Sequence, residues 1–281
     1  TDMGYEVKLA NPKKTHDIAC KKKTDRVDAK ILADLLRTNY LPEVWIPDEQ
    51  TLKFRDLARH KSNLTRLKTQ IQCKIKSYLL RKGVKYGKLW NEKTLSTLAQ
   101  EDQDIQNLIN VYNSLKKEEK EVMKRIKQVA RNRKETTLLM SMPGIAEFSS
   151  LMILAEIGDI QRFRSPKELV SYAGLCHGIY QSASTERSVH NTAVNKWLKW
   201  IIYECSGRAI MLDQRFQHYF YPIQKRKGAN TARRAMARKM LTSSFGDLKR
   251  RMSPISASII RDENSAIPGM LMSKVVSFLF R

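Results

Sequence analysis

Two aspartates stand three residues apart in the segment KTDRVDA, residues 23–29 of the sequence. On a helix this spacing places Asp25 and Asp28 on one face, where two carboxylates can share a divalent metal such as Mg²⁺. The helix dipole also favours acids at a helix start without any metal, so an ordinary helix start explains the pair equally simply. Asp34, two turns further along, is expected to be a plain surface residue.

Two serines, Ser182 and Ser184, occupy a segment of small residues that is expected to be a loop before a basic helix. A serine acts as a nucleophile only when a neighbouring group activates it. His177 or His190 could do so, although a lone histidine is more often structural. The residue pattern alone therefore favours a structural loop over a catalytic serine.

The segments MSMPGI (140–145) and LAEIGD (154–159) place a Pro-Gly turn between two apolar helices. This pattern resembles a helix-hairpin-helix, in which backbone N–H groups near Gly144 would meet a phosphate at the start of the second helix. A simple corner between two helices explains the same pattern without a ligand.

The chain has 52 Lys and Arg residues against 28 Asp and Glu, a net charge of +24. Such an excess indicates a polyanionic partner, of which nucleic acid is the usual one. The candidate phosphate-contacting side chains are Lys23, Arg26, Lys196, Lys199, Arg233, Arg234, Arg238 and Lys239. The last four cluster within two helical turns and suit phosphate contact, although a generic surface helix has the same composition. Trp197 and Trp200 are expected to pack in the core rather than stack on bases.

With 281 residues, 42% of them apolar, the chain is long enough for two compact units joined by helices. Its 11 glycines and 8 prolines are few, which excludes collagen-like and turn-dense β proteins and indicates helix. Four widely spaced cysteines without a CxxC pair argue against a disulfide framework and suit a reducing cytosol. No apolar run reaches about 18 residues, so no membrane span is expected. Because the first residue is Thr1, we expect the chain to begin partway through a longer protein.

The start of the chain is expected to hold one strand and one helix. Residues 5–11 alternate like a short strand that Pro12 ends, and a basic loop follows. Thr24 is a plausible N-cap for a helix over 25–37. The inner stripe of that helix is predicted to consist of Val27, Ile31, Leu32, Leu35 and Leu36.

Two long helices are predicted over 48–82 and 101–135. Both repeat apolar residues every seven positions, which predicts an antiparallel coiled-coil arm. The predicted seam consists of Leu57, Leu64, Leu67, Ile71, Ile75 and Tyr78 on the first helix and Ile105, Leu108, Tyr112, Leu115, Val122, Ile126 and Val129 on the second. The basic surface of the first helix is either an ordinary solvated face or a rail for nucleic acid.

Together these segments resemble the DEDD-type insertion-sequence transposases of the IS110 group, the family that includes the Piv and MooV DNA invertases. The segments VKLANP and KTDRVDAKILADLL resemble the end of its RuvC-like nuclease domain. The segment MPGI…LAEIGDIQRFRSPKELVSYAGL resembles the start of its C-terminal transposase domain, GLCHGIYQSAS…NKWLKW continues it, and ARRAMARKML is similar to its last helix. The order and spacing of these segments carry the resemblance, which covers nearly all of the chain from about residue 6 to about residue 240.

The resemblance implies a mainly α chain in four parts. They are the C-terminal part of a RuvC-like (RNase H-like) DEDD nuclease domain over 1–47, a coiled-coil arm over 48–135, a C-terminal transposase domain over 136–248 and an unassigned tail over 249–281. The domain over 136–248 is expected to start with the helix-hairpin-helix-like turn.

The resemblance also implies roles for individual residues. Asp25 and Asp28 match the last pair of the family's acidic tetrad and would hold Mg²⁺, while Ser182, or less well Ser184, matches its nucleophilic serine. The implied activity is that of a transposase or site-specific DNA recombinase that cuts and rejoins DNA strands, with a structured noncoding RNA as guide. A dimer or tetramer on DNA is expected, because an extended apolar seam between helices favours self-association. The expected location is the cytoplasm of a prokaryote.

The sequence departs from the family pattern in three places. The first Asp and the Glu of the tetrad have no counterpart, the family's Ser-Gly reads Ser-Ala, and TAVN at 192–195 lacks the usual Lys and Gly. An inactive, N-terminally truncated remnant that only binds nucleic acid is therefore the alternative function. A ribosomal or other RNA-scaffold protein fits the charge but leaves the ordered motifs unexplained.

Overall fold

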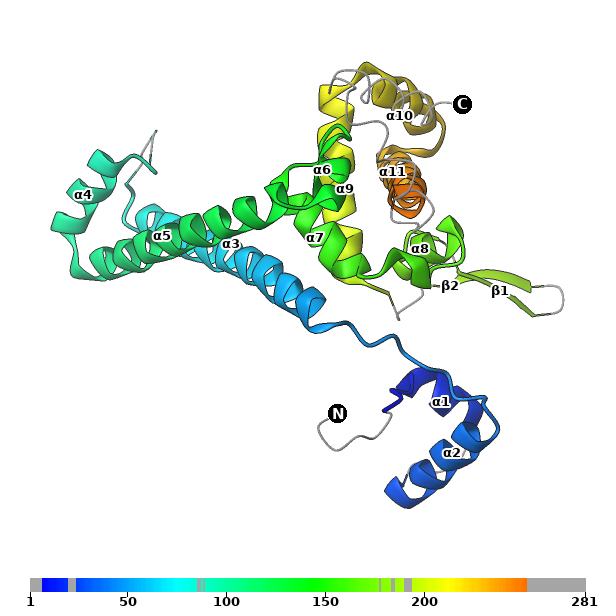
Figure 1. Cartoon of the computed structure of the whole chain (residues 1–281). Helices are drawn as coiled ribbons and strands as arrows, with labels where there is room; N and C mark the ends of the chain where they lie inside the picture. The colour runs from blue at the N-terminus through cyan, green and yellow to red at the C-terminus, as the bar shows by residue number, and fades with distance from the viewer. Residues whose placement is uncertain are drawn as a thin grey trace. The chain divides into compact units, whose positions relative to one another are not determined.

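The computed structural model describes residues 7–19, 24–84, 87, 89–176, 178–182, 185–189 and 194–251 (Figure 1). The chain divides into two compact units, Thr1–Gln50 and Thr51–Arg281, and each is described by itself. The described residues are mainly helical, as the low glycine and proline content predicts. None of the helices in these ranges combines the length and the apolar character that are needed to cross a lipid bilayer.

The first unit begins differently from the prediction. Over residues 7–11 the expected strand is replaced by a single antiparallel bridge between Ala10 and Glu43. Pro12 begins the helix α1 (Pro12–Ala19) instead of ending a strand. The side chain of Asn11 accepts hydrogen bonds from the backbone N–H groups of residues 13 and 14, each at 3.1 Å. An Asn cap followed by proline is a favourable helix start, so the first part of the predicted basic loop is helical.

The helix α2 (Asp25–Arg37) has the predicted bounds. The side chain of Thr24 accepts a hydrogen bond from the backbone N–H of Val27 at 3.3 Å, so it caps the helix as expected. Only part of the predicted inner stripe is covered within this unit. Leu35 is buried, whereas Leu32 and Leu36 are 37% and 52% exposed.

The predicted arm consists of three helices, α3 (Glu49–Arg81), α4 (Glu92–Glu101) and α5 (Gln103–Arg131). The predicted helix over 101–135 was wrong in its bounds, because Asp102 ends α4 and caps α5. Its carboxylate accepts a hydrogen bond from the N–H of Asp104 at 2.9 Å. A capping acid in extended backbone stops one helix and starts the next while the apolar spacing continues.

The helices α3 and α5 pack side by side and run antiparallel (Figure 1). Leu64 packs with Val122 and Ile126, while Ile75, further along α3, packs with Ile105 near the start of α5. The predicted seam is correct in its direction but not in every member. Leu67 is 42% exposed and belongs to the outer surface of α3. The coiled-coil geometry itself stays a prediction.

The helical core of the second unit follows the arm. Its elements are α6 (Lys134–Met140), α7 (Glu147–Ile157), the short 3₁₀ helix η1 (Ile160–Arg162), α8 (Pro166–Tyr172), α9 (Lys196–Leu212), α10 (Gln214–Lys227) and α11 (Ala229–Arg251). Every residue of α7 from Ser149 to Ile157 is buried, since α5, α6 and α9 pack around it. A helix that is apolar on nearly all sides is expected at the centre of a core.

The serine-bearing segment between α8 and α9 is not the predicted loop but a hairpin. Its strands β1 (Gly178–Ser182) and β2 (Thr185–Val189) pair antiparallel, with Gly178 opposite Val189 and Ser182 opposite Thr185. At the other end of the unit, α11 continues to Arg251, beyond the predicted domain boundary at 248. The rest of the predicted tail lies outside the described residues.

Candidate active site

The aspartate pair lies where the sequence predicts it, in the first turn of α2. The Asp25 side chain is exposed and Asp28 is half-buried, and Arg26 stands exposed between them. Lys23 lies outside the described residues. Two carboxylates match the oxygen donors through which Mg²⁺ is bound when water and substrate phosphate complete its coordination. Within the described ranges, no group of three or more His, Cys, Asp or Glu side chains comes together as a metal site.

Ser182 is the last residue of β1 and belongs to the second unit, whereas Asp25 and Asp28 belong to the first. The backbone pairing with Thr185 makes it the residue at the turn end of the hairpin. Ser184 and the two histidines considered as activating bases, His177 and His190, lie outside the described residues. The assignment of the nucleophile therefore stays a prediction.

Several predicted phosphate contacts have neighbours within the protein. Arg238 donates a hydrogen bond to the carbonyl oxygen of Leu175 at 2.9 Å. Lys239 lies 4.4 Å from the centroid of the Tyr219 ring, and burial lowers the pKa of its ammonium group. These two cations on α11 contribute to packing, whatever else they contact.

The neighbouring basic residues differ in exposure. Arg234 donates to the hydroxyl oxygen of Tyr203 at 3.4 Å, which is a long hydrogen bond. Arg233 is exposed on α11, Lys196 is exposed at the start of α9, and Lys199 is half-buried one turn further along. No described contact tests their predicted role toward phosphate.

Gly144 has a packing role that the sequence did not indicate. Its φ of +85° lies in the region that favours glycine. A Cβ at this position would lie 2.5 Å from the carbonyl oxygen of Cys205 and 2.7 Å from the backbone nitrogen of Ala209. The turn between α6 and α7 therefore lies directly against the backbone of α9. Its predicted contact with phosphate stays a prediction.

A buried charged cluster around Glu156 was missed by the sequence analysis. Glu156 lies on α7 with none of its side chain exposed. Arg59 on α3 donates from Nε and Nη2 to its two carboxylate oxygens at 2.7 and 2.8 Å. This hydrogen bonding raises the pKa of the Arg59 guanidinium, against the effect of its partial burial. Arg55, one turn earlier, donates to the backbone carbonyls of Ala155 and Glu156 at 2.8 and 3.2 Å.

A sequence signal for this cluster exists. Glu156 is the one acid in the apolar run LMILAEI, and Arg55 and Arg59 stand four apart on one helical face. A buried carboxylate must be paired and hydrogen-bonded to be tolerated. An acid inside an apolar helix therefore predicts a basic partner, although not its position about a hundred residues earlier in the chain.

A groove between α3, α7 and α9 combines aromatic and basic side chains. Trp197 is half-buried against the core, as predicted. The prediction for Trp200 was wrong, since this side chain is 39% exposed and lines the groove. Because the face of α9 that carries Trp200 is only partly covered by α3 and α7, the spacing within α9 could not reveal it.

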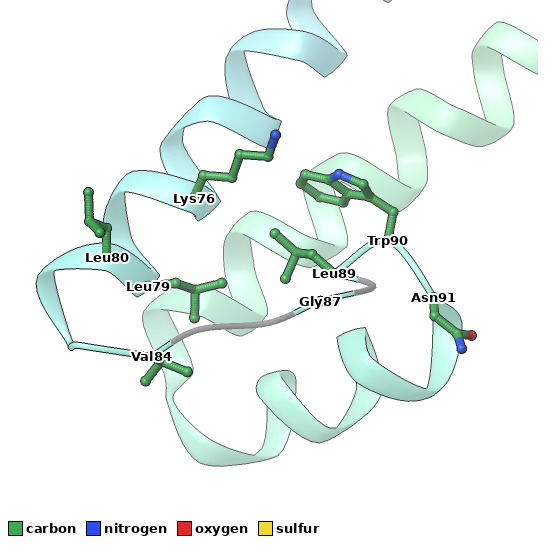
Figure 2. Close-up of a pocket in the computed structure, with 8 residues that line it drawn as sticks. All are labelled: Lys76, Leu79, Leu80, Val84, Gly87, Leu89, Trp90 and Asn91. Atoms are coloured by element: carbon green, nitrogen blue, oxygen red, sulfur yellow. The ribbon is translucent and has the colours of Figure 1, made fainter.

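A second pocket lies at the tip of the arm, between the end of α3 and the start of α4 (Figure 2). Its lining is mostly apolar and includes Leu79, Leu80 and Trp90. The Trp90 ring lies 5.1 Å from that of Tyr112, and Lys76 lies 5.9 Å from the Trp90 centroid. Like the groove between α3, α7 and α9, this pocket is lined by a tryptophan. Its lining contains fewer basic side chains than that of the groove.

Two transposase family models match separate regions of the chain. Residues 1–82 match the DEDD_Tnp_IS110 family model, described as "Transposase", and residues 136–221 match the model described as "Transposase IS116/IS110/IS902 family". Two regions of the chain are thus similar to domains of IS110-family transposases. The first matched region contains Asp25 and Asp28, and the second contains Glu156, Ser182 and Trp200.

The chain is also similar to part of a curated protein. Over 194 residues the chain is 28% identical to "Putative transposase y4qE" of Sinorhizobium fredii (strain NBRC 101917 / NGR234). The alignment covers 66% of this chain and 47% of that protein, so the chain spans about half the length of its relative. The aspartate pair falls in the N-terminal matched region and the hairpin in the C-terminal one, and the whole of α5 lies between the two regions.

Proposed function

We propose that this chain acts in DNA transposition, as part of an insertion-sequence transposase that cuts and rejoins DNA strands. The observation that carries the proposal is that two IS110-family regions occur in order, and each contains one of the proposed chemical groups. The net charge of +24 supports a nucleic-acid substrate.

Asp25 and Asp28 are proposed to hold Mg²⁺ from the first turn of α2. When bound, this ion would supply electrostatic stabilisation of the charge that develops on the phosphate. The two carboxylates come from one helical face, so they would bind from one side and leave the other side to water and phosphate oxygens. The exposed Arg26 would offer a further positive charge to the DNA backbone.

Ser182 is proposed as the nucleophile, with Ser184 as the other register. Its hydroxyl oxygen would form a bond to phosphorus while the bond from phosphorus to the departing deoxyribose oxygen breaks. The departing oxygen takes up a proton in exchange for the one that the serine loses, and it ends as a hydroxyl. In rejoining, a DNA hydroxyl oxygen attacks the phosphorus, the bond from phosphorus to the serine oxygen breaks, and the serine takes up a proton as the attacking hydroxyl loses one. The covalent intermediate keeps the strand end on the protein.

The partners of this proposed reaction are DNA and a structured noncoding RNA. In such a system base pairing reads the sequence, while the protein contacts backbone and shape. We propose that the protein assembles as a dimer or tetramer through its α3–α5 arm, and that it works on chromosomal DNA in the cytoplasm of a prokaryote.

A recombination assay tests the chemistry, with the protein encoded by the natural reading frame that contains this chain. Ser182→Ala is expected to remove both the recombinant product and the covalent protein–DNA species, and Asp25→Ala to remove strand cleavage while DNA binding remains. Asp34→Ala is the matched control, because Asp34 lies on the same helix and its carboxylate pairs with Arg37 at 3.7 Å. Wild-type recombination in the Ser182 or Asp25 variant would remove that residue from the mechanism.

The second candidate function is nucleic-acid binding without strand transfer. The net charge of +24 supports this function as well as it supports the first, because nucleic-acid binding needs no further chemical group. It predicts binding to DNA without any cleaved or covalent product in the wild-type assay. Both functions predict that affinity falls steeply as salt rises, since each phosphate contact releases counterions.

A further inference from the structure

The groove between α3, α7 and α9 has an aromatic floor. Trp200 contributes the most exposed ring, and its centroid lies 6.4 Å from that of Phe148 and 6.0 Å from that of Trp197. The interplanar angles of 60° and 76° mean that these neighbours meet Trp200 edge to face rather than by parallel stacking. Because Trp200 is 39% exposed, a planar apolar group of another molecule can reach its ring.

Basic side chains surround this floor. Lys196, Trp200, Glu204 and Arg208 stand at four-residue intervals, so they form one stripe along α9. With a rise of about 1.5 Å per residue, the two cations are separated by about 18 Å along the helix, with Trp200 between them. Glu204 is the acid of the stripe.

The facing wall from α3 adds Lys61 and Arg66. Lys61 lies 4.5 Å from the centroid of Phe148 and 3.5 Å from a carboxylate oxygen of Glu119, so its charge is already paired. Arg66, Lys196 and Arg208 form no ion pair with any residue in the described ranges. The ring of Trp200 is surrounded by these three cations and one acid, Glu204, so the groove has a net positive charge and attracts a ligand that has both a flat apolar face and negative charge.

We propose that this groove binds single-stranded nucleic acid, with an unpaired base stacked on Trp200 and phosphates of the same strand, on either side of that base, beside Lys196 and Arg208. A base offers a π-face to an aromatic ring only when it is not stacked within a duplex, and stacking tolerates any base. The proposal rests on the proposed function for the class of partner. It adds that one part of the protein reads unpaired nucleotides rather than duplex DNA.

The start of α7 faces the same groove through Ala146, Phe148 and Ser149. This is the helix end to which the sequence pattern assigned a phosphate. The groove therefore brings together two features: the predicted turn that contains Gly144, and the ring of Trp200, which the sequence pattern assigned to the core. The strongest competing occupant is an apolar segment of another protein chain, and the uncompensated charge of the groove argues against it.

Fluorescence anisotropy with labelled oligo(rU), oligo(dT) and blunt-ended duplex DNA tests the inference on the chain as it stands. Trp200→Leu keeps an apolar side chain but removes the ring face, and we expect it to weaken binding of the single strands by about 10-fold. Binding of the duplex is expected to be unchanged. Trp200→Phe, which keeps a ring, should recover most of the affinity, and Trp90→Leu at the arm tip is the matched control.

A second variant tests the phosphate contacts. Replacing Lys196 and Arg208 by glutamine together should reduce the slope of log affinity against log salt by about 1.4, at about 0.7 per contact with a single strand. Circular dichroism of each variant verifies that the fold is kept. Stronger binding of oligo(rU) than oligo(dT) would identify RNA as the source of the strand, and the reverse would identify an unwound DNA strand.

Two results would overturn the inference. One is equal affinity of Trp200→Leu and wild type for the single strands. The other is self-association that Trp200→Leu abolishes, with no effect on oligonucleotide binding, which would assign the groove to a second copy of the chain. Neither result bears on Ser182 or Asp25, because the measurement involves no cleavage. A failed recombination assay likewise leaves the groove measurement intact.

Discussion

Asn195 joins α9 to the buried Glu156 of α7 through a hydrogen bond of 2.8 Å from its amide nitrogen to a carboxylate oxygen. The same nitrogen lies 2.9 Å from the hydroxyl oxygen of Tyr172, and the amide oxygen caps α9 by accepting from the N–H of Leu198 at 2.9 Å. One side chain thus ends a loop, starts a helix and helps to pair a buried charge. The contacts of Arg59 with the same carboxylate extend this cluster to α3.

Replacing Asn195 should be costly for stability. Asn195→Ala removes a helix cap and a hydrogen bond to a buried charge, and we expect the free energy of unfolding to fall by about 2–4 kcal/mol. Asn195→Ser retains a capping oxygen but cannot reach Glu156 as an amide donor, so it should lose about half as much. Urea unfolding measures both. A loss below about 0.5 kcal/mol in Asn195→Ala would mean that the cluster contributes little.

Gly144→Ala is expected to destabilise the second unit, because the backbone at φ +85° and the 2.5 Å approach to the Cys205 carbonyl both exclude a Cβ. Overpacking of this kind costs about 1–3 kcal/mol, to which the strained φ adds. Gly207→Ala is the matched control on α9, where a Cβ meets no atom within 4 Å. That variant should be stabilised by about 0.5–1 kcal/mol, as glycine inside a helix is unfavourable. Thermal unfolding of both variants gives the comparison.

Truncating a side chain in the buried seam of the arm should lower the stability of the protein, whereas truncating an exposed leucine of the arm should not. Ile75 is fully buried against α4 and α5, so Ile75→Ala should lower the unfolding free energy by about 2–5 kcal/mol. Leu67→Ala, on the same helix, should change it by less than about 0.5 kcal/mol, since Leu67 is 42% exposed. Hydrogen exchange along α3 and α5 would localise the loss. Equal effects of the two variants would contradict the observed packing.

The packing of α3 on α5 should weaken in acid. Burial raises the pKa of Glu119, but hydrogen bonds from Lys68 and Thr65 and the charge of Lys61 outweigh it, so its pKa is lowered overall. A carboxyl with a lowered pKa in the folded state stabilises the protein above its unfolded pKa of about 4.3, and the contribution disappears as pH falls through the folded value.

Urea midpoints from neutral pH to about pH 3 check this expectation. Wild type should lose more stability over the acid range than Glu119→Gln, whose side chain does not titrate. Glu118→Gln is the control, since Glu118 is an exposed neighbour on α5. If wild type and Glu119→Gln lose the same amount, Glu119 contributes nothing to the acid response.

Local features were the predictable ones. The bounds of α2 follow from Thr24 as a cap and from the apolar spacing after it, which are contained in about 14 neighbouring residues. The start of α1 was missed because Asn11 and Pro12 also suit a strand end. The break at Asp102 was missed because the apolar spacing continues through it, and a capping acid changes the helix without changing that spacing.

Composition and spacing were enough to indicate a helical, basic chain and to place Asp25 and Asp28 on one helical face. Motif order suggested the family whose domain models match the chain, and that resemblance singled out Ser182. Composition, spacing and motif order did not reveal which side chains are buried. A helix repeats every 3.6 residues whatever lies beside it, but the stripe that is covered depends on partners far away in the sequence. Folding brings Arg59 to Glu156, 97 residues apart, presses Gly144 against α9 and leaves Trp200 open to solvent.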